Sequence, residues 1–125
     1  MLTNADYLEL LLQNPKPEET FFYHDRAILY ALAHKGEKYM ISLVDEDEDK
    51  QTETFLLVRY LEPTYSFLVQ NLITPREFFT HPYNTVYHAL LEYTEGEPVI
   101  LLADKYEDNL TIPDAYLPTA DARWN

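Results

Sequence analysis

The chain has 125 residues, 46% of them hydrophobic, and a formal net charge of −13 from 22 Asp and Glu against 9 Lys and Arg. This length and composition predict one globular domain over residues 1–125 and disfavour intrinsic disorder. The absence of cysteine excludes disulfides, Cys-ligated metal centres and a cysteine nucleophile. The acidity argues against direct nucleic-acid binding, which needs clustered Lys and Arg to neutralise phosphates.

The N-terminal segment, residues 1–14, predicts a short amphipathic helix. Its leucines recur at helical spacing, and Thr3 lies three residues before Asp6, as in a capping box. No apolar run approaches the roughly 20 residues of a membrane span. The start also lacks the basic and apolar regions of a signal peptide. We therefore expect a cytoplasmic protein that does not associate with membranes.

From Thr20 onward the pattern changes to runs of aromatic and β-branched residues, which are typical of strands. Short polar connections, including Lys35-Gly36, separate these runs, so consecutive strands should pair as antiparallel hairpins. Residues 83–93 fit either a further strand, Thr85–Tyr93, or a helix. The other predicted strands are Thr20–His24, Ala27–His34, Glu37–Val44, Glu53–Leu61 and Pro98–Ala103.

Two helical segments are predicted as an insertion near residues 63–80. Pro63 fits the first position of one helix, and Thr74-Pro75-Arg76-Glu77 has the pattern of a capping box that begins a second. The tail, residues 104–125, contains two prolines and is expected to be irregular, docking Tyr116, Leu117 and Trp124 on the core. The fold class is therefore α+β. We expect an antiparallel sheet of about five or six strands in a meander, spanning residues 20–103 and packed with two or three helices.

The acidity is segregated along the chain, with a net charge of −5 over residues 45–54 and another −5 over residues 95–125. The simplest explanation of the first segment is a solvated hairpin tip whose charge resists aggregation. Recognition of a basic protein is the functional alternative, because charged surfaces steer association. The candidate partner-binding residues are Asp45, Glu46, Asp47, Glu48 and Asp49.

The same stretch contains a candidate set of metal ligands. Asp45, Asp47 and Asp49 have the spacing of the first ligands of a calcium loop. However, Lys50 stands where that loop needs glycine and Leu56 where it needs a bidentate glutamate, so at most an adventitious cation site is expected. None of the histidines, which are His24, His34, His81 and His88, has metal-ligand spacing to another. We expect no cofactor.

Catalytic motifs are absent from the sequence. Neither Ser42 nor Ser66 lies in a nucleophile elbow, and with two glycines the chain has no phosphate-cradling loop. The 22 acidic residues make some close carboxylate pair inevitable, so such a pair is no evidence of acid–base catalysis. The sequence therefore favours a non-enzymatic protein while leaving catalysis open.

Several short motifs together resemble a family of small acidic bacterial α+β domains. They are Phe21-Phe22-Tyr23, the acidic turn after Leu43-Val44, the element Leu72–Glu77 and the late Tyr116-Leu117-Pro118. The resemblance spans about residues 20–118 and implies a bacterial, cytoplasmic domain. It implies no catalytic or binding residue.

The leading hypothesis is a non-enzymatic protein-interaction module that binds a basic partner through acidic and aromatic surface. Inhibitor, immunity and antitoxin proteins share its small size, acidity and lack of catalytic motifs. One alternative is a small-molecule-binding or enzymatic domain with its site in a cleft between sheet and helix. Another is a structural homo-oligomer, such as a homodimer.

Overall fold

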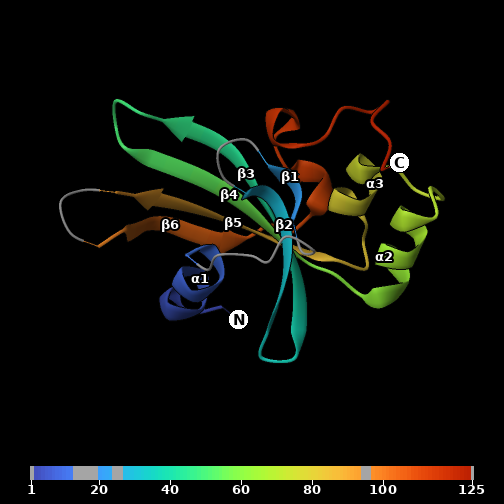
Figure 1. Ribbon diagram of the computed structural model, residues 1–125, viewed down its shortest axis with the longest axis horizontal. Helices are drawn as coiled ribbons and strands as arrows, with labels where there is room; N and C mark the ends of the chain where they lie inside the picture. The colour runs from blue at the N-terminus through green and yellow to red at the C-terminus, as the bar shows by residue number, and fades with distance from the viewer. Residues whose placement is uncertain (1, 13–19, 24–26, 94–96, 125) are drawn as a thin grey trace.

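A computed structural model describes residues 2–12, 20–23, 27–93 and 97–124. Its centre is an antiparallel sheet in which each strand pairs with the next one along the chain, in the order β1-β2-β3-β4-β5-β6 (Figure 1). The strands are β1 (Thr20–Tyr23), β2 (Ala27–His34), β3 (Glu37–Asp47), β4 (Thr52–Arg59), β5 (Thr85–Glu92) and β6 (Val99–Lys105). The predicted meander and the α+β class are confirmed, and residues 85–92 form a strand rather than a helix.

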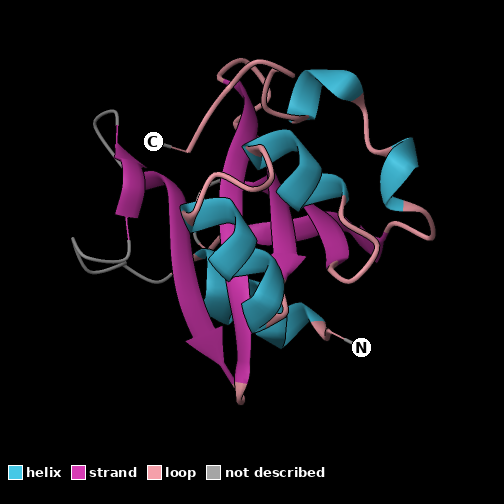
Figure 2. Ribbon diagram, turned by 90° about the vertical axis from the view of Figure 1, so that its right-hand side faces the viewer, coloured by secondary structure: helices cyan, strands magenta, loops and turns pink. Residues whose placement is uncertain are grey.

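The helices are α1 (Asn4–Leu11), α2 (Glu62–Val69), α3 (Pro75–Thr80) and the 3₁₀ turns η2 (Asn109–Thr111) and η3 (Asp114–Tyr116). Helix α1 packs on one face of the sheet, and α2, α3 and the C-terminal 3₁₀ turns pack on the other. Figure 2, viewed from the side of α2 and α3, shows these helices in front of the strands. In Figure 1 the hairpins β3–β4 and β5–β6 extend to the left, away from α2, α3 and the C terminus.

Local signals in the sequence explain where these elements begin and end. Thr3 and Thr74 cap α1 and α3 in reciprocal capping boxes with Asp6 and Glu77, as predicted. Helix α2 begins one residue earlier than predicted, with Leu61 as its N-cap and Pro63 in its first turn. Its end adopts a Schellman motif, with Asn71 at positive φ and the Leu72 N–H donating to the carbonyl of Phe67 at 2.8 Å.

The turn Lys35-Gly36 sets the register of the β2–β3 hairpin. Both residues have positive φ, 51° and 80°, as a two-residue type I′ turn requires, and glycine adopts this conformation without strain. His34 consequently pairs with Glu37 at the end of the ladder. This register places alternate residues of β2 on opposite faces of the sheet.

Each face of the sheet carries its own hydrophobic core. The face under α1 buries Tyr7, Leu10, Leu11, Tyr30, Leu32, Tyr39, Ile41, Leu43, Phe55, Leu57, Tyr87, Ala89 and Leu91. The other face packs against α2, α3 and the tail through Met40, Leu56, Val58, Tyr60, Leu68, Phe78, Phe79, Val86 and Ile112. Tyr116, Leu117 and Trp124 pack on this second core, as expected of the tail. Strands β3 and β4 are thus apolar on both faces, because a helical layer covers each side.

Candidate functional site

The acidic stretch lies on a strand and a turn rather than in a loop. Asp45, Glu46 and Asp47 belong to β3 and pair with β4, while Glu48 and Asp49 form part of the turn. The pairing continues into this stretch after a shift in register that follows Leu43. Val44 is left without an opposite residue on β4, between the pairs Leu43–Phe55 and Asp45–Thr54. Such an extra residue is a β-bulge, which bends a strand without ending it.

The three candidate metal ligands of this stretch are not brought together. Asp45, Asp47 and Asp49 do not form a group with ligand atoms within 4.8 Å of one another in the part of the chain that the structure describes. Instead, Asp47 Oδ1 accepts a hydrogen bond from the backbone N–H of Lys50 at 3.1 Å. Asp47 therefore stabilises the turn, which is an ordinary role for aspartate.

A hollow of about 320 Å³ lies beside this hairpin, at the outer end of the sheet. Within it, Glu46 of β3 stands directly opposite Glu53 of β4, and Glu53 is 8% exposed. The backbone N–H of Tyr93 donates to the carbonyl of Gln51 at 2.8 Å, which ties the end of β5 to the turn. We call this feature the acidic hollow; it is lined by Glu46, Asp47, Glu48, Gln51, Thr52, Glu53 and Tyr93.

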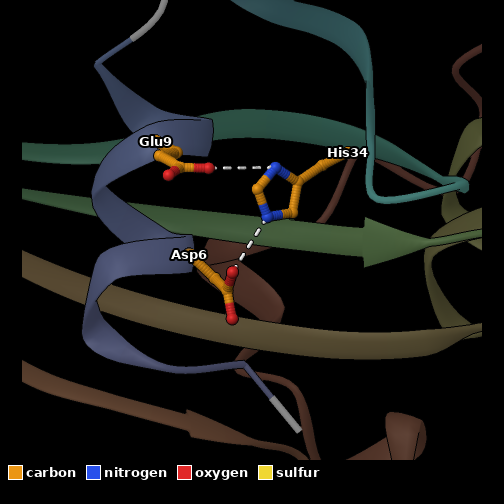
Figure 3. A group of neighbouring side chains, drawn as sticks. All are labelled: Asp6, Glu9 and His34. Carbon is orange, nitrogen blue, oxygen red and sulfur yellow. Dashed lines mark hydrogen bonds and ion pairs between the residues drawn. The ribbon is translucent and has the colours of Figure 1, made fainter.

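A second charged cluster joins α1 to the end of β2. Asp6 and Glu9 lie three positions apart on α1, on one side of the helix. Their carboxylates meet the ring of His34 from two directions (Figure 3). Asp6 Oδ1 is 3.0 Å from His34 Nε2, and Glu9 Oε2 is 3.4 Å from His34 Nδ1. The side chains of Asp6 and His34 are each 7% exposed, so this ion pair is buried.

The Asp6 carboxylate is the centre of this cluster. Oδ1 also accepts from Lys35 Nζ at 2.9 Å, and Oδ2 accepts from the backbone N–H and the hydroxyl of Thr3 at 2.9 and 3.0 Å. The bond from Lys35, followed by those from Thr3 and His34, holds the pKa of Asp6 well below its usual range. The same bond raises the pKa of Lys35. Asp6 therefore stays ionised and fixes α1 to the β2–β3 hairpin.

This arrangement favours a charge network over a metal centre. Asp6, Glu9 and His34 are the group of described side chains whose ligand atoms do lie within 4.8 Å of one another. A metal ion binds one imidazole nitrogen, whereas here the two carboxylates face different nitrogens. Lys35 also occupies the oxygen of Asp6 that faces His34. The contacts of Asp6 with Lys35, Thr3 and His34 therefore form a hydrogen-bonded charge network between α1 and the β2–β3 hairpin.

The cluster of Asp6, Glu9 and His34 could not be predicted from the sequence, because the capping box with Thr3 already explained the carboxylate of Asp6. Asp6 and His34 are separated by 28 positions, and only the docking of α1 on the sheet brings them together. One signal was present in the sequence. Asp6 precedes Leu10 by four residues, so a carboxylate lies on the apolar side of the helix, where it needs a buried partner.

The remaining histidines have local roles where the structure describes them. His81 Nδ1 accepts from the backbone N–H of Tyr83 at 3.1 Å. His88 is half-buried, with its ring 4.7 Å from that of Tyr106, as expected for a packed histidine. His24 lies outside the described residues.

Comparisons with known proteins add no functional assignment. None of the described helices is long and apolar enough to cross a bilayer. No protein-family model, curated protein or solved structure matches the chain. The features with functional potential are therefore the two charged sites and the hollows of the sheet.

Proposed function

We propose that the chain is a cytoplasmic, non-enzymatic interaction module that binds a basic protein through the acidic hollow. An inhibitor, immunity or antitoxin protein would act in this way. The proposed contact is one Arg or Lys side chain of the partner, inserted between Glu46 and Glu53. Asp47 and Glu48 also line the hollow, and the neighbouring Asp45 and Asp49 add to the negative charge of the hairpin.

The observation that carries the proposal is the cross-strand pair Glu46–Glu53. Two like charges directly opposite each other destabilise a sheet, and a local conflict of this kind is typical of functional sites. A cation placed between the two carboxylates turns their repulsion into attraction and forms charge-assisted hydrogen bonds. The ring of Tyr93, which also lines the hollow, offers a face for a cation–π contact.

The position of the hollow also suits protein recognition. It lies on the hairpin β3–β4, which extends beyond the helical layers together with β5–β6 (Figure 1). The Cβ atoms of residues directly opposite each other on antiparallel strands lie roughly 5 Å apart, within the Debye length of about 8 Å at physiological salt, so Glu46 and Glu53 act on an approaching cation together. This field speeds association with a basic surface and weakens as salt rises.

The test is a titration of the ¹⁵N-labelled protein with a nona-arginine peptide, a defined cationic probe. We expect amide shifts concentrated at Glu46, Glu53 and Tyr93. Glu46→Gln should weaken binding roughly tenfold, the value of one charge-assisted hydrogen bond. Asp121→Asn removes one charge from the exposed C-terminal segment and is the matched control, expected to leave the affinity within about twofold.

The free energy of unfolding of the Glu46→Gln variant distinguishes a loss of peptide binding from a loss of stability. Because Glu46→Gln removes a like-charge pair, it should raise the free energy of unfolding by about 0.2–1 kcal/mol while it weakens peptide binding. Equal weakening by Glu46→Gln and Asp121→Asn would show that the acidic surface acts only through net charge. Shifts spread evenly over all acidic segments would contradict the proposal in the same way.

A further inference from the structure

A second hollow, of about 430 Å³, lies on the α1 side of the sheet at the opposite end of β4 from the acidic hollow. Arg59 and Glu53, which line the two sites, are six positions apart on β4, about 20 Å at the strand rise of about 3.3 Å per residue. Ligand pockets commonly occupy about 300–1,000 Å³. We call this feature the tyrosine hollow; it is lined by Leu2, Tyr7, Arg59, Thr85, Tyr87, Ala103, Asp104, Lys105 and Glu107.

Arg59 is the feature of this hollow that points to a ligand. Its side chain is half-buried, and Nη2 donates to Thr85 Oγ1 at 3.3 Å. In the described part of the chain Arg59 forms no ion pair with a carboxylate, although the protein carries 22 acidic residues. A guanidinium has five N–H donors in a planar fork that matches a carboxylate. The remaining donors of Arg59 are therefore suited to an anion from outside the chain.

Two tyrosines form the wall of the hollow. The rings of Tyr7 and Tyr87 meet edge to face with centroids 6.3 Å apart, and both side chains are almost fully buried. Burial, with Tyr87 and Asp104 nearby, raises the pKa of Tyr7 to about 12. Its hydroxyl thus stays protonated and can donate a hydrogen bond. The rings supply apolar area, to which Leu2 and Ala103 add.

The charges of the lining select for a single negative charge. Arg59 and Lys105 carry two positive charges, and Asp104 and Glu107 carry two negative ones. Each lining carboxylate repels a dianion such as phosphate about twice as strongly as a monoanion, whereas a monoanion is sufficient to pair with the guanidinium of Arg59. The apolar rings beside it favour a ligand with an apolar body over an inorganic ion.

We propose that the tyrosine hollow binds a small organic monocarboxylate, with the carboxylate on Arg59 and an apolar or aromatic body against Tyr7 and Tyr87. This site is separate from the acidic hollow and from the protein contact proposed there. The ligand proposed for this cleft between the sheet and α1 is thus a small organic monocarboxylate.

The experiment uses benzoate as the probe and benzamide as its uncharged isostere, each added to the ¹⁵N-labelled full chain. We expect benzoate to shift the amides of Tyr7, Arg59, Tyr87 and Ala103, and benzamide to bind at least tenfold more weakly. Inorganic phosphate should leave these amides unchanged. Equal binding of benzoate and benzamide, or shifts by phosphate at the same amides, would overturn the proposal.

Substitutions of Arg59 test whether its guanidinium binds the carboxylate of benzoate. Arg59→Gln should weaken benzoate binding roughly tenfold or more, the value of a hydrogen-bonded charge, and Arg59→Lys should restore only part of it because lysine lacks the fork. Arg76→Gln, on α3, is the matched control and should bind as the wild type does. If Arg59→Gln fails to fold, Ala103→Leu narrows the hollow without changing charge and should abolish binding. Unchanged affinity in either folded variant would refute the site.

Discussion

The docking of α1 can be tested at a single leucine. Leu10 is fully buried in the core under α1, whereas Leu12, two residues further on, is 47% exposed. An isolated helix of eight residues is not stable in water, so packing must hold α1 in place. Replacing a buried leucine by alanine removes its transfer free energy and leaves a cavity, at a cost of about 2–5 kcal/mol.

We expect Leu10→Ala to lower the free energy of unfolding by about 3 kcal/mol, because α1 lies at the edge of the core and can settle partly into the cavity. A single domain has about 5–15 kcal/mol in total, so this loss is large. For a chain of this size the melting temperature should fall by roughly 10 °C. The measurement is urea unfolding followed by far-ultraviolet circular dichroism, with the m-value compared between variants.

Leu12→Ala is the matched control, with an expected change within about 0.5 kcal/mol for an exposed site. The reasoning is refuted if Leu10→Ala costs less than about 1 kcal/mol or no more than Leu12→Ala. Either result would mean that α1 does not contribute to the core. The ion pair between Asp6 and His34 would then lose its structural basis.

Two further predictions concern charge and capping. The folded-state pKa of Asp6 lies below its ordinary value of 3.8, so its stabilising contribution is present above that pH and is lost as the pH falls. Asp6→Asn should therefore be most destabilising near neutral pH and approach the wild type below about pH 4, as measured by urea midpoints; a constant difference at all pH values would contradict this. Thr74→Ala should cost about 1 kcal/mol by removing the capping bond to Glu77, and Thr74→Ser should cost almost nothing in the same assay.

Most of the fold could be predicted because its signals are local. Lys35-Gly36 fits a type I′ turn and Thr74 begins a helix, and both patterns lie within a few residues. The extension of β3 through Asp47 could not be predicted, because five consecutive acidic residues are typical of a loop. Pairing with β4 and the bulge after Leu43 overcome that local preference.

The candidate sites depend on contacts that no local pattern contains. Asp6 meets His34 only after α1 has docked, and Glu46 faces Glu53 only because the bulge sets the register. The acidic stretch is visible in the sequence by its charge, whereas the hollow that Glu46, Asp47 and Glu48 line together with Glu53 of β4 is not. Arg59 gave no signal in the sequence, because a single arginine on a strand is common. Only the structure shows that it forms no ion pair with a carboxylate among the described residues.

The order of the sheet has a consequence for how the protein assembles. Every strand pairs with its neighbour in the sequence, so the sheet can grow strand by strand, with the longest connection, residues 60–84, lying between β4 and β5. The contact of α1 with β6 is different, because it joins the two ends of the folded chain across nearly its whole length. Closing so long a loop costs more entropy than closing a hairpin, so we expect this contact to form late and to open early. The tyrosine hollow is bounded by both elements, so it forms only once α1 has docked against β6. A ligand bound there would stabilise this docking and, with it, the complete fold.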